Sequence, residues 1–219
     1  MSEKEKTKYA WPTIIMLTLM LIVAPAMSWY YLQKGAEYRI EALRELKQNR
    51  GKADSIFSCS PANWGKLDLD SLSDKIVIVN IIKYKGQLAD KQTLTAKKLH
   101  EQFGERKNIF FLSLLEGADS LQASEYYKAQ KLKRANRTYF VVPGNATTKQ
   151  NWIKAFRLDQ NGDFSNAECP FYAYVDVNGI IRNYYDGNDE NRVKKMVEHI
   201  AMKVFDKKEN PRLTRELEK

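Results

Sequence analysis

The sequence predicts an α/β domain that follows a single membrane-spanning helix. Residues 11–33 form an apolar run without a charged residue, and from residue 75 onward strand-like apolar runs alternate with amphipathic helix-like segments. Hydrophobic residues make up 43% of the chain and charged residues 29%, which is typical of a folded domain. At 219 residues the chain can hold one ordinary domain and an appendage.

Residues 11–33 are the expected transmembrane helix, after an N-terminal tail of residues 1–10. At roughly 1.5 Å per residue this run covers the hydrocarbon core of a bilayer, and aromatic residues 29–31 close it at headgroup depth. A cleaved signal peptide is the alternative, because lysines precede the run and Ala24–Ala26 resembles a small-residue cleavage site. Pro25 beside the last small residue, and the helical segment that follows, favour an uncleaved anchor.

A polar helical stalk is expected over residues 34–54, with Gly51 as its stop. A narrow apolar stripe at three- and four-residue steps predicts packing on the domain or on a partner helix; its members are Ala36, Ile40, Leu43 and Leu46. Both flanks of the membrane run carry Lys and Arg. The very short N-terminal flank therefore decides the expected orientation, with the N-terminus inside and the large domain exported.

Strands and helices are expected to alternate over residues 55–205. The expected strands are 75–82, 108–115, 138–142, 171–177 and 180–185. The expected helices are 93–103, 121–132, 148–158 and 191–205. Asn178-Gly179 predicts a hairpin between the last two strands. The order β-α-β-α-β-α-β-β-α is a thioredoxin-like α/β layout, and residues 206–219 are expected to form a charged, loosely ordered tail.

Charge and cysteine content narrow the classes of function. The net charge of +9 is scattered and could face anionic lipid, an acidic protein or nucleic acid, and the membrane segment disfavours nucleic acid. Cys59 and Cys169 have no CxxC or CxxxC partner, and His100 and His199 are the only histidines, so a zinc site is not expected. A disulfide between the two cysteines and two separate buried thiols remain equal alternatives. Both histidines are expected at the surface or its boundary.

Three stretches carry a family resemblance: KIVIVNIIKYKGQLADKQTLTAKKL, FFLSLLEGADSLQASEYYKAQKL and CPFYAYVDVNGIIRNYYDG. Together they resemble the SCO (SenC) family, membrane-anchored thioredoxin-fold proteins of cytochrome oxidase assembly. The resemblance covers roughly residues 55–205 with the anchor and stalk. Peroxiredoxins and membrane-tethered thiol-disulfide oxidoreductases share much of the same outline.

The resemblance also locates a degenerate metal site. SCO proteins that bind copper use a CxxxC pair after the first core strand and a distant histidine. In this chain the two cysteine positions correspond to Gly86 and Asp90, and the histidine position to Glu168. Glycine and aspartate supply no soft thiolate for copper(I), and dithiol exchange needs two nearby thiols. We therefore expect no metal, no cofactor and no catalytic residue at this site.

Cys169 has a second interpretation, because it precedes Pro170 at a strand start where thioredoxin folds carry a cis-proline. If Pro170 is cis, Cys169 would lie near Gly86 and Asp90. One hypothesis is a lone reactive thiol. A packing residue, or half of a disulfide, is the simpler interpretation, since no histidine or helix terminus is evident nearby to activate the thiol.

Asp90 and Glu168 could form a carboxylate pair that binds a hard cation such as Ca²⁺ or performs acid–base work. The simpler interpretation is that Asp90 is a helix N-cap and that Glu168 is solvated.

The resemblance implies a membrane-anchored, non-enzymatic pseudo-enzyme that acts as scaffold, subunit or assembly factor of a cytochrome oxidase-type respiratory complex. Its expected partners are the membrane and respiratory subunits or assembly factors, and not nucleic acid. Its expected location is a single-pass inner (cytoplasmic) membrane protein with the C-terminal domain in the periplasm or an equivalent exported compartment. The alternatives are a thiol-dependent oxidoreductase or peroxidase-like enzyme using Cys169 or Cys59, and a carboxylate metal-binding module at Asp90 and Glu168.

Overall fold

The structure is a computed structural model that describes residues 3–54, 58–62, 67–68, 72, 74–131, 138–158 and 171–205. The chain divides into two compact units, residues 1–45 and 46–219.

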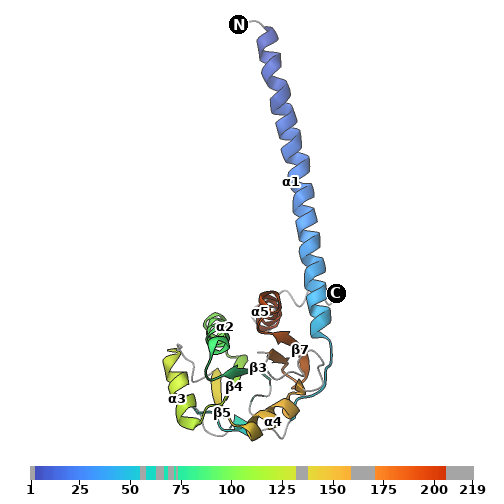
Figure 1. Ribbon diagram of the computed structural model, residues 1–219. Coiled ribbons are helices and arrows are strands. Elements are labelled where there is room, and N and C mark those ends of the chain that lie inside the picture. Colours follow the sequence, from blue (N-terminus) through green and yellow to red (C-terminus); the bar gives the residue numbers. More distant parts are fainter. Residues whose placement is uncertain are drawn as a thin grey trace. The chain divides into compact units, whose positions relative to one another are not determined.

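Helix α1 (Glu3–Leu46) accounts for nearly all of the first unit, ends at the first residue of the second unit, Leu46, and continues through both of its prolines (Figure 1). From Trp11 onward it is long and apolar enough to cross a membrane, by length and composition. A signal sequence near an N-terminus has the same properties, so α1 is suited to be a membrane anchor or a signal. The helix ends at Leu46, before the expected stop at Gly51. The reason is that the chain beyond Leu46 forms hydrogen bonds with the sheet of the domain, described below.

The second unit is built on a five-stranded mixed sheet with the order β5-β4-β3-β6-β7. Its strands are β3 (Ile76–Lys83), β4 (Ile109–Glu116), β5 (Tyr139–Gly144), β6 (Phe171–Val175) and β7 (Ile181–Asp186). Strands β3, β4 and β5 are parallel, and β6 and β7 continue the sheet antiparallel. The helices are α2 (Gln87–Phe103), α3 (Ser120–Ala129), α4 (Ala146–Ala155) and α5 (Glu190–Phe205). A short antiparallel pair, β1 (Ser58–Cys59) and β2 (Leu67–Asp68), precedes the sheet.

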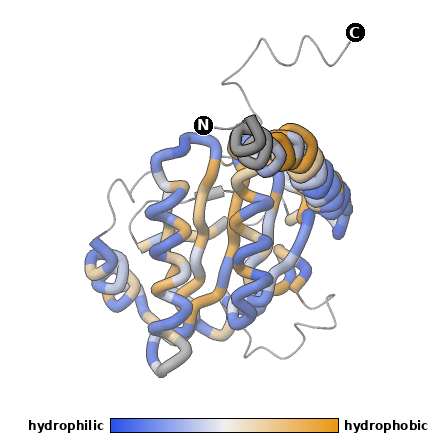
Figure 2. Tube along the Cα trace, turned by 90° about the horizontal axis from the view of Figure 1, so that it is seen from above, coloured by the Kyte–Doolittle hydropathy of each residue, from blue (hydrophilic) through white to orange (hydrophobic). Residues whose placement is uncertain are grey.

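Helices cover both faces of this sheet, as Figure 1 shows, with α2 and α5 on one face and α4 on the other. The alternation of side chains along β3 explains the two layers. Ile76, Ile78 and Ile82 pack with α2 and α5, whereas Val77 and Val79 pack with α4. In Figure 2 the strands are largely hydrophobic and the helices carry alternating hydrophilic and hydrophobic stretches, as expected for amphipathic helices on a buried sheet.

The hairpin predicted at Asn178-Gly179 is confirmed. Asp176 organises the turn, since its Oδ1 accepts hydrogen bonds of 2.9 Å from the backbone N–H groups of Asn178 and Ile180. Its Oδ2 lies 2.6 Å from the guanidinium of Arg182 on β7. Gly179 has a φ of +72°, which a residue without a Cβ adopts at little cost.

The segment that follows α1 lies along both outer strands of the sheet. At the β7 edge, Arg50 N–H donates to Ile181 O over 3.0 Å, and Ile181 N–H donates to Gly51 O over 2.9 Å. At the β5 edge, Ala62 N–H donates to Val141 O over 2.8 Å. Residues expected in the stalk linker thus contribute backbone pairing to the domain.

Candidate functional site

The carboxyl ends of the parallel strands meet at one edge of the sheet, and this edge carries the expected site. Two backbone hydrogen bonds join the strand ends: Tyr84 N–H donates to Glu116 O over 3.0 Å, and Gly117 N–H donates to Gly144 O over 2.9 Å. Strand β6 runs antiparallel to β3, so its first residue, Phe171, lies at this same edge. In open α/β sheets ligands bind at such an edge.

Gly86 is the N-cap residue of α2 and provides no side chain to cap the helix. Its φ of +113° lies in a region that L-residues rarely adopt, and a Cβ built there would meet no atom within 4 Å. A hydrogen bond connects α2 to the end of β3, before this loop: the Oε1 of the buried residue Gln92 accepts the N–H of Lys83 over 2.9 Å. The position that the resemblance matched to a metal-binding cysteine is therefore a backbone turn.

Asp90 lies within the first turn of α2 and is exposed. The expectation that it caps the helix was wrong, because Gly86 occupies the cap and α2 begins at Gln87, earlier than the apolar pattern indicated. A carboxylate in the first turn still interacts favourably with the helix dipole. In the part of the chain that the structure describes, no three His, Cys, Asp or Glu side chains gather closely enough to hold a metal ion.

Glu168, Cys169 and Pro170 lie outside the described residues. The proposed carboxylate pair, the lone reactive thiol, the cis-proline and the Cys59–Cys169 disulfide therefore all remain predictions.

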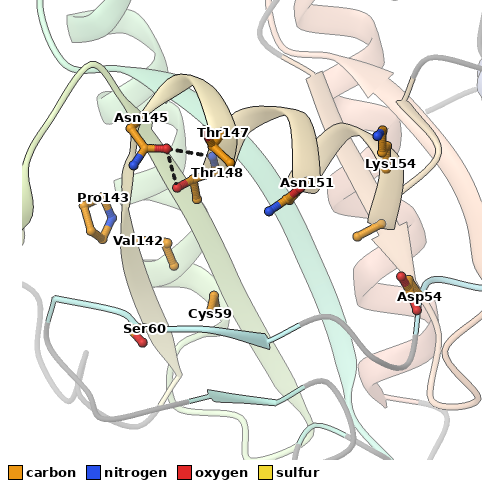
Figure 3. Close-up of a pocket in the computed structure, with 11 residues that line it drawn as sticks. Asp54, Cys59, Ser60, Val142, Pro143, Asn145, Thr147, Thr148, Asn151 and Lys154 are labelled. Atoms are coloured by element: carbon orange, nitrogen blue, oxygen red, sulfur yellow. Dashed lines mark hydrogen bonds between the residues drawn. The ribbon is translucent and has the colours of Figure 1, made fainter.

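Cys59 lies in β1, where it pairs with Leu67 of β2 and packs partly against the hydrophobic core on the α4 face. It also lines a cavity of about 600 Å³ between β1, the end of β5 and α4 (Figure 3). Val142 and Pro143 line the cavity from β5. Ala155 and a set of hydroxyl, amide and charged side chains complete the lining; the polar members are Asp54, Ser60, Asn145, Thr147, Thr148, Asn151 and Lys154.

The start of α4 shapes one wall of this cavity. Asn145 is the N-cap, and its Oδ1 accepts the backbone N–H and the hydroxyl of Thr148, both over 2.8 Å. Farther along the helix, Lys149 Nζ lies 2.6 Å from Glu116 Oε1, so an ion pair joins α4 to the end of β4. The described lining of the cavity contains one thiol, that of Cys59.

Both histidines are buried, contrary to the expectation of surface positions. His100 is 2% exposed and His199 is fully buried. The imidazole of His100 lies 3.1 Å from Thr138 Oγ1, and Nδ1 of His199 lies 2.6 Å from the hydroxyl of Tyr185. These hydrogen bonds offset part of the cost of burying the polar rings. The spacing of apolar residues in the sequence could not reveal such partners, and so it could not predict that the two histidines are buried.

Sequence reasoning also missed a set of polar side chains inside the α2 face of the sheet. Ser113 Oγ donates to Asn80 Oδ1 over 2.5 Å, and both residues are buried. Asn80 also hydrogen-bonds Tyr172, and Ser113 hydrogen-bonds Tyr139. Burial raises the pKa values of both phenols well above the ordinary value, so they stay protonated at neutral pH. One polar residue inside each of the runs IVIVNIIK and IFFLSLLE was the available clue.

No protein-family model matches this sequence, and no curated protein matches it. Solved structures do match in fold. BsSco, described as a member of the Sco family of cytochrome c oxidase assembly proteins, superposes with a TM-score of 0.56 at 13% identity, over 73% of this chain and 97% of its own. A SCO1/SenC family lipoprotein from Bacillus anthracis gives 0.54 at 15% identity, over 71% and 97%.

A thiol:disulfide interchange protein of the thioredoxin family from Chlorobium tepidum gives a TM-score of 0.50 at 17% identity, over 68% of this chain and 98% of its own. At such identities the similarity establishes the fold alone. The chain has an α/β thioredoxin-like fold, with structural similarity to SCO/SenC proteins and to thiol-disulfide oxidoreductases, as the order of its elements predicted.

Proposed function

We propose that this chain is a membrane-anchored, non-enzymatic SCO-like protein that acts through protein contacts, as a scaffold, subunit or assembly factor of a cytochrome oxidase-type respiratory complex. In this proposal α1 stays in the inner membrane with its N-terminus inside, and the thioredoxin-like domain lies in the periplasm or an equivalent exported compartment.

The observation that carries the proposal is the start of α2. Gly86 offers no side chain there, and Asp90 offers an exposed hard carboxylate, where the resemblance places two thiols. Copper(I) binding and dithiol exchange at this loop need soft, closely spaced sulfur ligands, which these two positions do not supply. A domain that keeps the fold without these groups is better suited to binding a partner than to moving copper or electrons.

Two further features support the proposal. The similarity to BsSco and to the SCO1/SenC lipoprotein covers almost the whole of those chains, so the domain keeps their architecture. Helix α1 is apolar over a length that spans a bilayer, which would hold the domain beside membrane complexes.

The direct test is purification of the tagged full-length chain from its native membrane in mild detergent, with co-purifying proteins quantified by mass spectrometry. We expect oxidase subunits, or subunits of another respiratory complex, at near-stoichiometric amounts. A chain that purifies alone would contradict the scaffold role.

A matched pair of variants separates this proposal from a thiol enzyme. The double variant Cys59→Ser/Cys169→Ser removes every thiol of the chain. If the chain is a scaffold, the double variant should still bind its partner and should restore oxidase activity in a strain that lacks the wild-type chain. Loss of activity with the partner still bound would favour the thiol-dependent alternative.

A further inference from the structure

A second cavity lies at the other end of the strands from the start of α2, where β3 begins and β6 ends. It has a volume of about 380 Å³, which is within the usual range for small-molecule sites. Apolar groups from three segments line it: Leu46, Ile76 at the start of β3, and Val177 after β6. An apolar body would therefore gain burial free energy here.

Tyr174 brings a phenol hydroxyl group to the lining of this cavity. The residue is 2% exposed as a whole, and it lines the cavity together with Asp176 and Arg182. Burial raises the pKa of the phenol well above its ordinary value, and Asp176 raises it further, against the opposing effect of Arg182. The phenol is therefore protonated at neutral pH and can donate a hydrogen bond. An occupant of the cavity with a hydrogen-bond acceptor can receive this donor.

The charged groups around the cavity leave a positive balance. Asp176 and Arg182 form an ion pair at 2.6 Å, with side chains 15% and 18% exposed, and compensate each other. Lys47 and Lys203 also line the cavity, and Asp74 opposes them. Two cations against one anion favour an occupant with a negative charge.

We propose that this cavity binds a carboxylate with a medium-length alkyl chain. The chain packs against Leu46, Ile76 and Val177, and a carboxylate oxygen accepts the hydrogen bond of the Tyr174 hydroxyl near Lys203. This proposal is independent of the proposed function, because the cavity lies away from the start of α2 and needs no partner protein.

The test uses full-length protein transferred from detergent into amphipol, titrated with octanoate by calorimetry. Octanol and acetate serve as probes that lack the charge and the alkyl chain, respectively. We expect octanoate to bind more tightly than octanol, and acetate not to bind. Tyr174→Phe removes the hydrogen-bond donor and should weaken octanoate binding about tenfold. Val177→Phe fills the cavity and should abolish binding.

Tyr172→Phe is the matched control, because Tyr172 lies on the same strand and packs in the same core cluster but does not line this cavity. It should leave the octanoate affinity unchanged. Thermal unfolding without ligand verifies that each variant is folded. Equal octanoate affinity in the wild type, Tyr174→Phe and Val177→Phe would overturn the proposal, as would octanol binding as tightly as octanoate. Binding of an anionic phospholipid in nanodiscs, but not of octanoate, would overturn the assignment to a free carboxylate.

Discussion

Asn80 on the central strand β3 and Ser113 on the neighbouring strand β4 face each other, and the hydroxyl of Ser113 donates to the amide oxygen of Asn80 over 2.5 Å. Both side chains lie among apolar residues that cover the α2 face of the sheet. In this environment a satisfied polar pair fixes the strand register, whereas an unsatisfied one is costly.

Ser113→Ala should therefore destabilise the domain. The change removes the donor to Asn80 Oδ1 and also the contact with Tyr139. We expect a loss of about 1–3 kcal/mol in the free energy of unfolding, measured by denaturant titration. Ser120→Ala, at an exposed position at the start of α3, should change it by less than about 0.5 kcal/mol. Equal effects of the two substitutions would show that the buried pair contributes nothing.

Gly86→Ala tests the backbone at the start of α2. With φ at +113° and no atom within 4 Å of an added Cβ, the cost comes from the backbone conformation alone. We expect about 1–2 kcal/mol of destabilisation, seen as a lower midpoint of thermal unfolding. Gly35→Ala, in α1, also has no atom within 4 Å of its added Cβ and should not lower the midpoint. An unchanged midpoint for Gly86→Ala would mean that the loop adopts another conformation in solution.

His100 should make the stability of the domain depend on pH. Burial lowers its pKa below the ordinary value of 6.5, against a smaller opposite effect of Glu101. The unfolded chain therefore binds more protons below about pH 6.5 than the folded chain, and stability falls as the pH drops through that value. His100→Gln should reduce this slope in unfolding experiments between pH 7.5 and about 5. The exposed change Lys98→Gln on the same helix should keep it, and an identical slope in both variants would contradict the assignment to His100.

Asp176→Asn should destabilise the hairpin strongly. The neutral side chain loses the ion pair with Arg182 and leaves that mostly buried guanidinium uncompensated. We expect a loss of about 3 kcal/mol. Asp186→Asn is the comparison, because Asp186 accepts one exposed backbone N–H, from Asn188, and the expected loss is about 1 kcal/mol or less. Circular dichroism during denaturant unfolding gives both values, and a smaller loss for Asp176→Asn than for Asp186→Asn would contradict the prediction.

The sequence predicted the fold wherever a local pattern had one dominant cause. The apolar runs identified β3 and β4, and Asn178-Gly179 identified the hairpin, because burial on both faces and a positive φ each restrict residue type. Long-range pairs could not be predicted in this way. The burial of His100 depends on Thr138, and the Asn80–Ser113 pair depends on the register between two strands.

In the candidate site, too, the features that residue identity decides were predicted, and those that depend on the three-dimensional arrangement were not. The sequence indicated that the positions of Gly86 and Asp90 lack thiols, because residue identity alone decides this. It did not reveal that Gly86 is the N-cap of α2. The helix start was predicted from the spacing of apolar residues, and a glycine adds nothing to that pattern. Both cavities also escaped prediction, since each is lined by segments that are distant in sequence.

The strand edges covered by the segment after α1 would matter most if α1 holds the domain at a membrane, as proposed above. Proteins tethered to a bilayer meet one another at high local concentration, and open sheet edges then recruit neighbouring copies into aggregates. Residues 50–53 occupy part of the β7 edge, Ala62 bonds to the β5 edge, and Pro143 removes one backbone donor from β5. The short stretch that follows α1 therefore also protects the domain against self-association through its strand edges.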